Sequence, residues 1–389
     1  GDILDSFYNH ILQFILLRII LSWGRRLAIS SRMDSSVYSM SEISDELIPW
    51  QKKFGRNNLP WQGTKNPYLI WVSEIMLQQT QVKTVIPYYQ KFIENFPDIN
   101  TLAMADDDDV MKLWSGLGYY ARARNLHESA KIIKSKFRGE FPKKITELVS
   151  LPGVGRSSAG AISSFAFNKK TPILDGNVKR VFTRIYGIKD WAGIVSVEKK
   201  LWILAEKNLP ESRFGKYNQA LMDLGATLCI KKEPQCVQCP IKKLCKSYEN
   251  NWTDIIPAAK PKKEKLTEIS YFYIFQYKSK FLFIKKPKKG IWGGLWAFPE
   301  FKKELNIEQW GFKNIGIKDF KLIQNGIMTT TFTHYKLQMN YQHLEVKKFK
   351  NRGVMDGLLW EHKDKIEEGA HPSPLKKLVK KLLIDKNLL

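Results

Sequence analysis

Residues 151–180 read LPGVGRSSAGAISSFAFNKKTPILDGNVKR, and they specify the fold more strongly than any other part of the chain. Gly153 and Gly155 stand one residue apart, and glycine allows turn conformations that other residues rarely adopt. The Ala- and Ser-rich run Arg156–Phe167 predicts a helix directly after this turn. The N-terminus of that helix would offer free N–H groups to a phosphate. An ordinary helix–turn–helix with glycine caps is the alternative interpretation.

A single acid follows the predicted helix. Asp175 stands in the segment DGN after the apolar run TPIL, and ITELVS before the glycine turn predicts the end of another helix. Together these segments resemble the helix-hairpin-helix element and the Gly/Pro-Asp loop of the DNA base-excision glycosylases. The resemblance implies that a hairpin at about residues 145–167 binds one DNA phosphate through Gly153, Val154 and Gly155. The acid would then lie at a fixed distance from that phosphate.

Composition points to a polyanionic partner. The chain has 389 residues, enough for two or three domains that each bury a core. Lys and Arg outnumber Asp and Glu by 63 to 38, and the net charge of +25 favours nucleic acid as the partner. Excess lysine can also serve only to keep a surface soluble.

An acidic run, Asp106–Asp109, is predicted to be a solvated first turn of a helix, where it suits the helix dipole.

Residues 1–40 are predicted to be an N-terminal extension, non-native or disordered, that the function does not require. The run Ile11–Leu21 is apolar, but it contains Arg18 and is too short to span a bilayer comfortably. A signal peptide places its basic residues before the apolar run, whereas here they follow it. An organelle-targeting or membrane-touching helix is the alternative. We expect the functional protein to begin near Met40 and to form no stable membrane association.

The stretch SEIMLQQTQV contains the second candidate acid. An apolar helix is predicted from Tyr68 to Gln78, and Glu74 is the only charge within it. Such a carboxyl is either a salt-bridged helix residue or a catalytic acid whose pKa is raised by desolvation. The polar run Gln78, Gln79 and Thr80 follows, and its side chains suit hydrogen bonds to base edges.

Residues 116–126, GLGYYARARNL, combine flexible glycines, aromatic rings and arginines. Proteins that pry base steps apart use apolar or aromatic wedges and hold the flanking phosphates with basic side chains. Leu117 and Tyr119 are therefore candidate DNA wedges, together with Gln79. Arg122 and Arg124 are candidate phosphate contacts. A tyrosine-lined seam between packed helices is the alternative interpretation.

Four cysteines form one cluster near the end of the helical region. All cysteines of the chain lie in residues 229–245, and such clustering favours metal ligation in a reducing compartment over a disulfide framework. The C-x2-C pair alone suits zinc. The complete spacing resembles the 4Fe–4S loop of the endonuclease III and MutY glycosylases, which favours one 4Fe–4S cluster over zinc. The ligands would be Cys229, Cys236, Cys239 and Cys245. Lysines surround them, so we expect a redox-inert cluster that shapes a basic, DNA-facing loop.

A linker and a second domain follow. The composition of residues 251–267 changes to AAKPKKEK, which is typical of a Pro/Lys linker. In residues 268–389, the segments ISYFYIFQY and KFLFIKK are rich in aromatic and β-branched residues, with alternating patterns that predict strands of a separate α+β domain. PSPLKKLVKKLL predicts a closing helix.

From about Ser41 to the C-terminus, the chain resembles the adenine DNA glycosylases of the MutY family. SEIMLQQTQV, GLGYYARARNL, LPGVGRSSAGAI, LDGNVKR and the cysteine spacing occur in the family's order. The resemblance implies a mainly α N-terminal catalytic region at residues 41–250, built of a helix-hairpin-helix, a six-helix barrel and a 4Fe–4S subdomain. An α+β Nudix-like domain would follow.

The resemblance also implies an activity: hydrolysis of the N-glycosidic bond of adenine mispaired with 8-oxoguanine or guanine in double-stranded DNA. We expect a monomer in the bacterial cytoplasm that associates with the nucleoid through DNA, or a nuclear or mitochondrial protein if the source is eukaryotic. Glu74 corresponds to the family's catalytic general acid, and Asp175 and Asn177 to its DGN segment. Lyases of the endonuclease III type carry a lysine early in the helix after the hairpin, where this chain has Ser157. Without that amine, we expect base removal without efficient strand cleavage.

The C-terminal domain resembles the Nudix-like module with which the family reads oxidised guanine. A Nudix hydrolase needs a metal-binding pair of glutamates, which residues 308–313, EQWGFK, do not supply. Pyrophosphate hydrolysis is therefore not expected. The family's Phe-Ser-His loop for the lesion base corresponds here to Phe332, Thr333 and His334.

Two other functions remain open at this stage. A bifunctional glycosylase-lyase is disfavoured by Ser157 and by the additional C-terminal domain. A non-catalytic iron–sulfur protein that only senses DNA damage is disfavoured by the presence of both Glu74 and Asp175.

Overall fold

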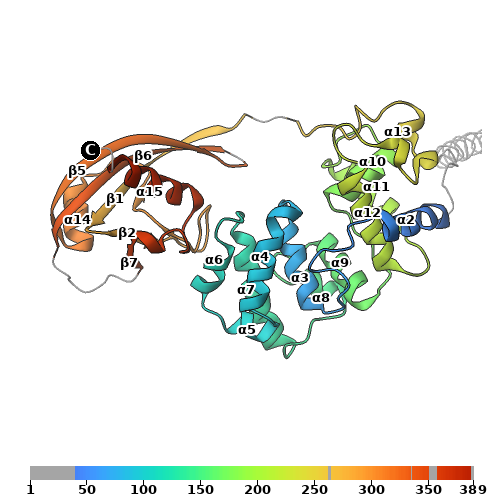
Figure 1. Cartoon of the computed structure of the whole chain (residues 1–389), viewed down its shortest axis with the longest axis horizontal. Coiled ribbons are helices and arrows are strands. Elements are labelled where there is room, and N and C mark those ends of the chain that lie inside the picture. The colour runs from blue at the N-terminus through green and yellow to red at the C-terminus, as the bar shows by residue number, and fades with distance from the viewer. Residues whose placement is uncertain (1–39, 262–263, 334, 350–356, 387–389) are drawn as a thin grey trace, which may run out of the picture.

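The computed structural model describes residues 40–261, 264–333, 335–349 and 357–386. The N-terminal extension expected at residues 1–40 lies outside the described residues, apart from Met40, which begins a helix. Two groups of helices are followed by a domain built on a β-sheet (Figure 1). Within the described ranges, no helix is long and apolar enough to cross a membrane.

The first group of helices, which we call the first lobe, surrounds an aromatic core. Trp71, Phe92 and Trp114 are fully or almost fully buried in it. Edge-on packing of Phe92 against Trp114 is favoured by the ring quadrupoles. The lobe consists of α3 (Pro67–Leu77), α4 (Val82–Asn95), α5 (Ile99–Met104), α6 (Asp107–Trp114), α7 (Ala121–Lys136), α8 (Ile145–Val149) and α9 (Arg156–Phe167).

The second lobe combines the first helix of the described chain with the helices that follow residue 175. The first helix of the described chain, α2, packs against α12. This contact closes the lobe around a core that includes Phe182, Leu201 and Tyr217. The first lobe is thus inserted between two parts of the second. The second lobe consists of α2 (Met40–Phe54), α10 (Gly176–Ile185), α11 (Val195–Lys207), α12 (Phe214–Thr227) and α13 (Lys246–Glu249), with short turns η1 (Cys236–Gln238) and η2 (Lys242–Leu244).

Local sequence signals explain where the key helices begin. Asn66 caps α3, because its side chain accepts a hydrogen bond from the Tyr68 N–H, and Pro67 occupies the first turn. Gly155 precedes α9, which has the predicted bounds. Because α3 packs against α9 and α9 against α12, these helices join the two lobes.

The C-terminal domain contains a seven-stranded sheet of order β3-β2-β1-β6-β5, with β4 pairing with β1 and β7 with β2. Among the strand pairs of the described residues, β1 and β6 run parallel to each other and the other pairs are antiparallel. The strands are β1 (Leu266–Tyr277), β2 (Lys280–Lys285), β3 (Trp296–Ala297), β4 (Glu300–Phe301), β5 (Ile317–Thr331), β6 (Tyr335–Phe349) and β7 (Leu358–His362).

Helices cover both faces of this sheet. Alternate side chains of β1 point to opposite faces, as the pleat requires. Phe275 packs with Trp310 of α14 (Ile307–Ile315), while Phe272 belongs to the core that includes Leu378 of α15 (Ser373–Lys386). A short turn, η3 (Lys363–Lys365), precedes α15. The predicted fold class, a helical region followed by an α+β domain, is confirmed.

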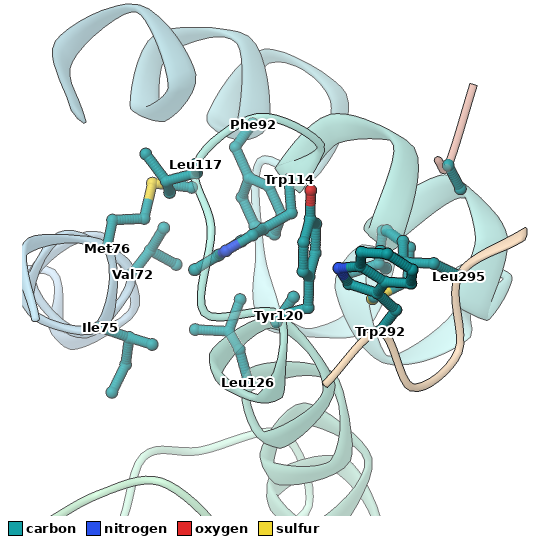
Figure 2. Packing of buried hydrophobic residues seen from close by; sticks show 14 of the residues in the cluster. Val72, Ile75, Met76, Phe92, Trp114, Leu117, Tyr120, Leu126, Trp292 and Leu295 are labelled. Carbon is teal, nitrogen blue, oxygen red and sulfur yellow. The ribbon is translucent and has the colours of Figure 1, made fainter. Parts of the chain in front are cut away.

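The C-terminal domain packs against the first lobe. Trp292 approaches Tyr120 (Figure 2), and both belong to one buried core. Asp107 pairs with Lys288 at 3.0 Å, and Asp108 accepts a hydrogen bond from the indole of Trp296 at 3.1 Å. The acidic run is therefore not simply a solvated turn, because two of its residues bind the other domain.

Candidate active site

Glu74 lies in the middle of α3, where Val72, Ile75 and Met76 beside it are buried. Burial, and after it the negative charge of Asp175, raise the pKa of Glu74 from 4.5 to about 8. No ion pair or hydrogen bond with the described residues opposes this shift. Glu74 is therefore not a salt-bridged helix residue, and it keeps its proton at neutral pH.

Asp175 is the N-cap of α10, so it stands at the start of the second lobe. Its carboxylate accepts hydrogen bonds from the Val178 N–H at 2.8 Å and from the Asn177 amide at 3.2 Å. Burial raises the pKa of Asp175, while these donors and the positive charge of Arg180 favour its ionised form. Glu74 lacks such donors, and the charge of Asp175 adds to the rise in the pKa of Glu74, so Asp175 is the more readily ionised of the two acids.

The raised pKa of Glu74 predicts a pH-dependent cost to stability. Between pH 4.5 and about 8 the folded protein binds more protons than the unfolded chain, so stability falls as pH rises. For one such group the slope is roughly 1.4 kcal/mol per pH unit. We expect Glu74→Gln to unfold at a higher urea concentration than the wild type, with a larger difference at pH 8 than at pH 5. An equal difference at both pH values would contradict the assignment.

The glycine hairpin has the geometry of a phosphate anchor. Gly153 adopts a φ of +77°, and a Cβ there would lie 2.9 Å from the Cβ of Asn125. Gly153 and Gly155 are exposed, whereas Val154 is buried and anchors the turn in the core. No side chain caps α9, so its first N–H groups are free to bind a phosphate.

Two side chains connect this hairpin to the two acids. Gln78, at the end of α3, donates to the Gly153 carbonyl and to the Ser158 hydroxyl, both at 3.3 Å. Ser157 accepts a hydrogen bond from the Leu174 N–H at 3.0 Å, directly before Asp175. Ser157 therefore supports the position of Asp175.

The candidate DNA wedges separate into exposed and buried residues. Tyr119 is 46% exposed, and Gln79 is exposed as well; both have positive φ values, 50° and 57°. Leu117 is only 5% exposed, and Figure 2 shows it beside Met76 in the core. The side chain of Leu117 packs inward, so the structure does not present it as a wedge, and its contact with DNA stays a prediction. The Thr80 hydroxyl accepts a hydrogen bond from Arg122 at 3.1 Å, so it helps to hold the turn after α3 in place.

Both arginines of residues 116–126 have partners within the protein. Arg122 is 8% exposed, and burial lowers its pKa to about 10. Arg124 donates to the Gly293 carbonyl of the C-terminal domain at 2.5 Å. Both therefore have structural partners that the sequence pattern did not indicate.

The candidate lesion loop reaches the exposed tyrosine of the first lobe. Phe332 packs against Trp292 and Tyr335, which fixes the start of the loop. The Thr333 hydroxyl lies 3.3 Å from the hydroxyl of Tyr119. His334 lies outside the described residues.

The four cysteine thiols line one cavity together with Arg184. No group of three or more His, Cys, Asp or Glu side chains in the described part of the chain is arranged to hold a single metal ion. Four thiols around one shared space offer the sulfur ligands that zinc and iron–sulfur clusters both use. Arg184 is 2% exposed and donates to the Cys229 sulfur at 3.4 Å.

Helix α10 connects this loop to the candidate catalytic acid. Arg180 donates to the Cys229 carbonyl at 2.7 Å and to the Asn177 side chain at 2.9 Å, and Asn177 in turn holds Asp175. Arg180 and Arg184 are functional residues that the motifs in the sequence did not indicate. The signal that could have identified them is their four-residue spacing on a helix that starts at the acid.

A helix-hairpin-helix that offers N–H groups, followed by an acid at the start of the next helix, defines a base-excision DNA repair protein. The model of the HhH-GPD superfamily base excision DNA repair proteins matches residues 72–207, and a NUDIX domain model matches residues 270–381. The chain belongs to the adenine DNA glycosylase family.

The relatives that show this come from Buchnera aphidicola. The adenine DNA glycosylase of the subspecies Baizongia pistaciae is 43% identical over 338 residues, which cover 86% of this chain and 95% of the relative. That of the subspecies Schizaphis graminum is 40% identical over 349 residues, 88% and 99% of the two chains. A solved structure of a thermostable thymine-DNA glycosylase has a TM-score of 0.50 and 29% identity, over 54% of this chain and 97% of that one.

Proposed function

We propose that this protein excises adenine mispaired with 8-oxoguanine or guanine in duplex DNA and leaves the strand uncut. Its membership of the adenine DNA glycosylase family supports adenine as the base. The observation that carries the chemistry is that Asp175, from the other lobe, lies close enough to the buried Glu74 for its charge to raise the pKa of Glu74, while Asp175 itself accepts a hydrogen bond from the Val178 N–H. The net charge of +25 supports binding to the DNA backbone.

The two acids divide the reaction between them. Once adenine has left the base stack, Glu74 donates its proton to the ring nitrogen N7, which makes adenine a better leaving group. The electrons of the glycosidic bond leave with the base, and the Asp175 carboxylate stabilises the positive charge that develops on the sugar. Glu74, now ionised, takes a proton from the attacking water. The products are free adenine and an abasic site.

Strand cleavage would require an amine that attacks the sugar. Position 157 carries a hydroxyl instead, and that hydroxyl is engaged by the Leu174 N–H. This supports a monofunctional enzyme.

One assay tests the proposed function. Duplexes with adenine opposite 8-oxoguanine, guanine or thymine are incubated with the protein, and free adenine and strand breaks are measured with and without subsequent alkali. We expect adenine release from the first two duplexes, with breaks only after alkali. Strand breaks without alkali, together with a covalent enzyme–DNA adduct after borohydride reduction, would indicate a lyase, and DNA binding without base release would indicate a damage sensor.

We further propose that the four thiols bind one 4Fe–4S cluster. Cys229, Cys236, Cys239 and Cys245 would hold it, and it would supply structural cross-linking of the loop that follows α12. Because Arg180 and Arg184 bind this loop, its order supports the position of Asp175. The lysine-rich loop would then be held in shape to face DNA.

Loss of a cluster ligand should weaken DNA binding. We expect Cys239→Ser to lose iron and visible absorbance and to bind the A:8-oxoguanine duplex at least about tenfold more weakly. Iron and sulfide content, absorbance and a binding titration at fixed salt measure this effect. A wild-type protein that contains one zinc ion and no iron would contradict the cluster.

A further inference from the structure

Arg122 forms an unusually large number of contacts for one side chain. Its guanidinium lies between the end of α3 and the loop before α7, and its two terminal nitrogens share their four N–H groups among six acceptors. These are the carbonyl oxygens of Ile75 (3.0 Å), Met76 (2.7 Å), Gln78 (2.6 Å), Leu117 (3.4 Å) and Gly118 (3.2 Å), and the hydroxyl of Thr80 (3.1 Å).

The acceptors on α3 belong to the helix of the candidate general acid. Ile75 and Met76 directly follow Glu74, and their carbonyls lie near the C-terminal end of the helix, where intrahelical partners run out. A buried cation there satisfies these carbonyls and complements the helix dipole. Arg122 therefore fixes where α3 ends, next to the residue that donates the proton.

The remaining acceptors flank the two exposed wedge candidates. Gln78 and Thr80 enclose Gln79, and Leu117 and Gly118 precede Tyr119. A positive φ in a non-glycine residue persists only where its surroundings enforce it, and Gln79 and Tyr119 both have one. The guanidinium also lies 5.3 Å from the centre of the Tyr119 ring.

Tyr119 in turn contacts the C-terminal domain. Its hydroxyl is 3.3 Å from that of Thr333, in the loop expected to read the base opposite adenine. A continuous set of contacts therefore runs from Thr333 through Tyr119 and Arg122 to the helix of Glu74.

We propose that Arg122 is a positioning residue that couples recognition of the base opposite adenine to the placement of Glu74. The proposal rests on the proposed function, because it assumes that Glu74 acts on adenine. It assigns Arg122 no contact with DNA.

The chemistry of arginine fits this role and that of lysine does not. A guanidinium presents five N–H donors in a rigid plane, so it binds carbonyls of two segments at once and stacks on a ring. A lysine has three donors on one point charge and could satisfy only one of the two segments. Arg122→Lys therefore keeps the charge and removes the connection.

Single-turnover rates on A:8-oxoguanine and A:G duplexes test the proposal. We expect Arg122→Lys to slow adenine release from the A:8-oxoguanine duplex roughly tenfold or more, and release from the A:G duplex much less. The ratio of the A:8-oxoguanine rate to the A:G rate should therefore fall. Thr80→Val, which removes one acceptor, should lower the ratio to a smaller extent. Leu201→Ala is the control, because it opens a cavity in the second lobe and lowers thermal stability without changing the ratio.

A double-mutant cycle separates coupling from simple damage. Tyr119→Phe removes the hydroxyl that contacts Thr333 and keeps the ring. We expect this change to lower the ratio of the A:8-oxoguanine rate to the A:G rate when it is made in the wild-type protein, but not when it is added to the Arg122→Lys variant. An unchanged ratio in Arg122→Lys, or fully additive effects in the double mutant, would overturn the proposal. A wild-type protein that releases no adenine from either duplex would instead refute the proposed function.

Discussion

Glu74→Gln should lower the single-turnover rate of adenine release from an A:8-oxoguanine duplex by about 10³-fold or more. Glutamine has nearly the shape of a protonated glutamate, so α3 and the site around it should keep their structure. It has no acidic proton to donate to the base and cannot accept one from water. Affinity for the duplex should therefore remain close to that of the wild type, and only the chemical step should fail.

The matched control is Glu94→Gln on α4, an exposed acid far along the first lobe. This variant should retain both the wild-type rate of adenine release and the wild-type affinity for the duplex. Measurement of both rates with enzyme in excess over DNA avoids any influence of product release. A Glu74→Gln protein that retains the wild-type rate would remove Glu74 from the mechanism.

Asp175→Asn should slow the same step by about 10²- to 10³-fold. Asparagine is as good an N-cap as aspartate, so the hydrogen bond from the Val178 N–H should persist and α10 should stay in place. What disappears is the negative charge next to the sugar. The change thus isolates the electrostatic contribution of the carboxylate.

Asp175→Ala provides the comparison, because it removes both the charge and the cap. We expect it to lose about 1 kcal/mol of stability in addition to the rate, whereas Asp175→Asn loses only the rate. Urea unfolding and single-turnover assays on both variants separate the two effects. Equal activity of wild type and Asp175→Asn would show that the charge is not required.

The features predicted correctly are those that neighbouring residues determine. Gly153 and Gly155 allow turn conformations that other residues rarely adopt, and helix-forming residues follow them, so the hairpin and the bounds of α9 could be predicted. The strands β1 and β2 could be predicted in the same way from their runs of aromatic and β-branched residues. The sequence could not decide whether Glu74 has a salt-bridge partner, because that depends on residues far away in the sequence.

Orientation within residues 116–126 could not be read from the pattern. Leu117 and Tyr119 are two residues apart and both are plausible wedges, yet only Tyr119 points outward. The choice depends on the packing of Leu117 into the core of the first lobe. Arg122 shows the same limit, since a basic residue beside tyrosines suggests a phosphate contact until the carbonyls around it are known.

Contacts between the domains also could not be predicted from the sequence. Asp107 and Asp108 begin a helix and fit its dipole, which is a sufficient local explanation. Their partners Lys288 and Trp296 come from a domain that begins more than a hundred residues later. Nothing in the charge pattern of either segment identifies the other.

The protonation state of Glu74 is the claim on which the mechanism depends most. It can be measured by carbon-13 NMR of protein labelled at the glutamate side-chain carboxyl, with the Glu74→Gln variant used to assign the signal. We expect the signal absent from the variant to titrate with a midpoint near 8, so that Glu74 is protonated at neutral pH. A midpoint near the ordinary value of 4.5 would show an ionised Glu74 that cannot donate a proton to adenine, and would contradict the mechanism.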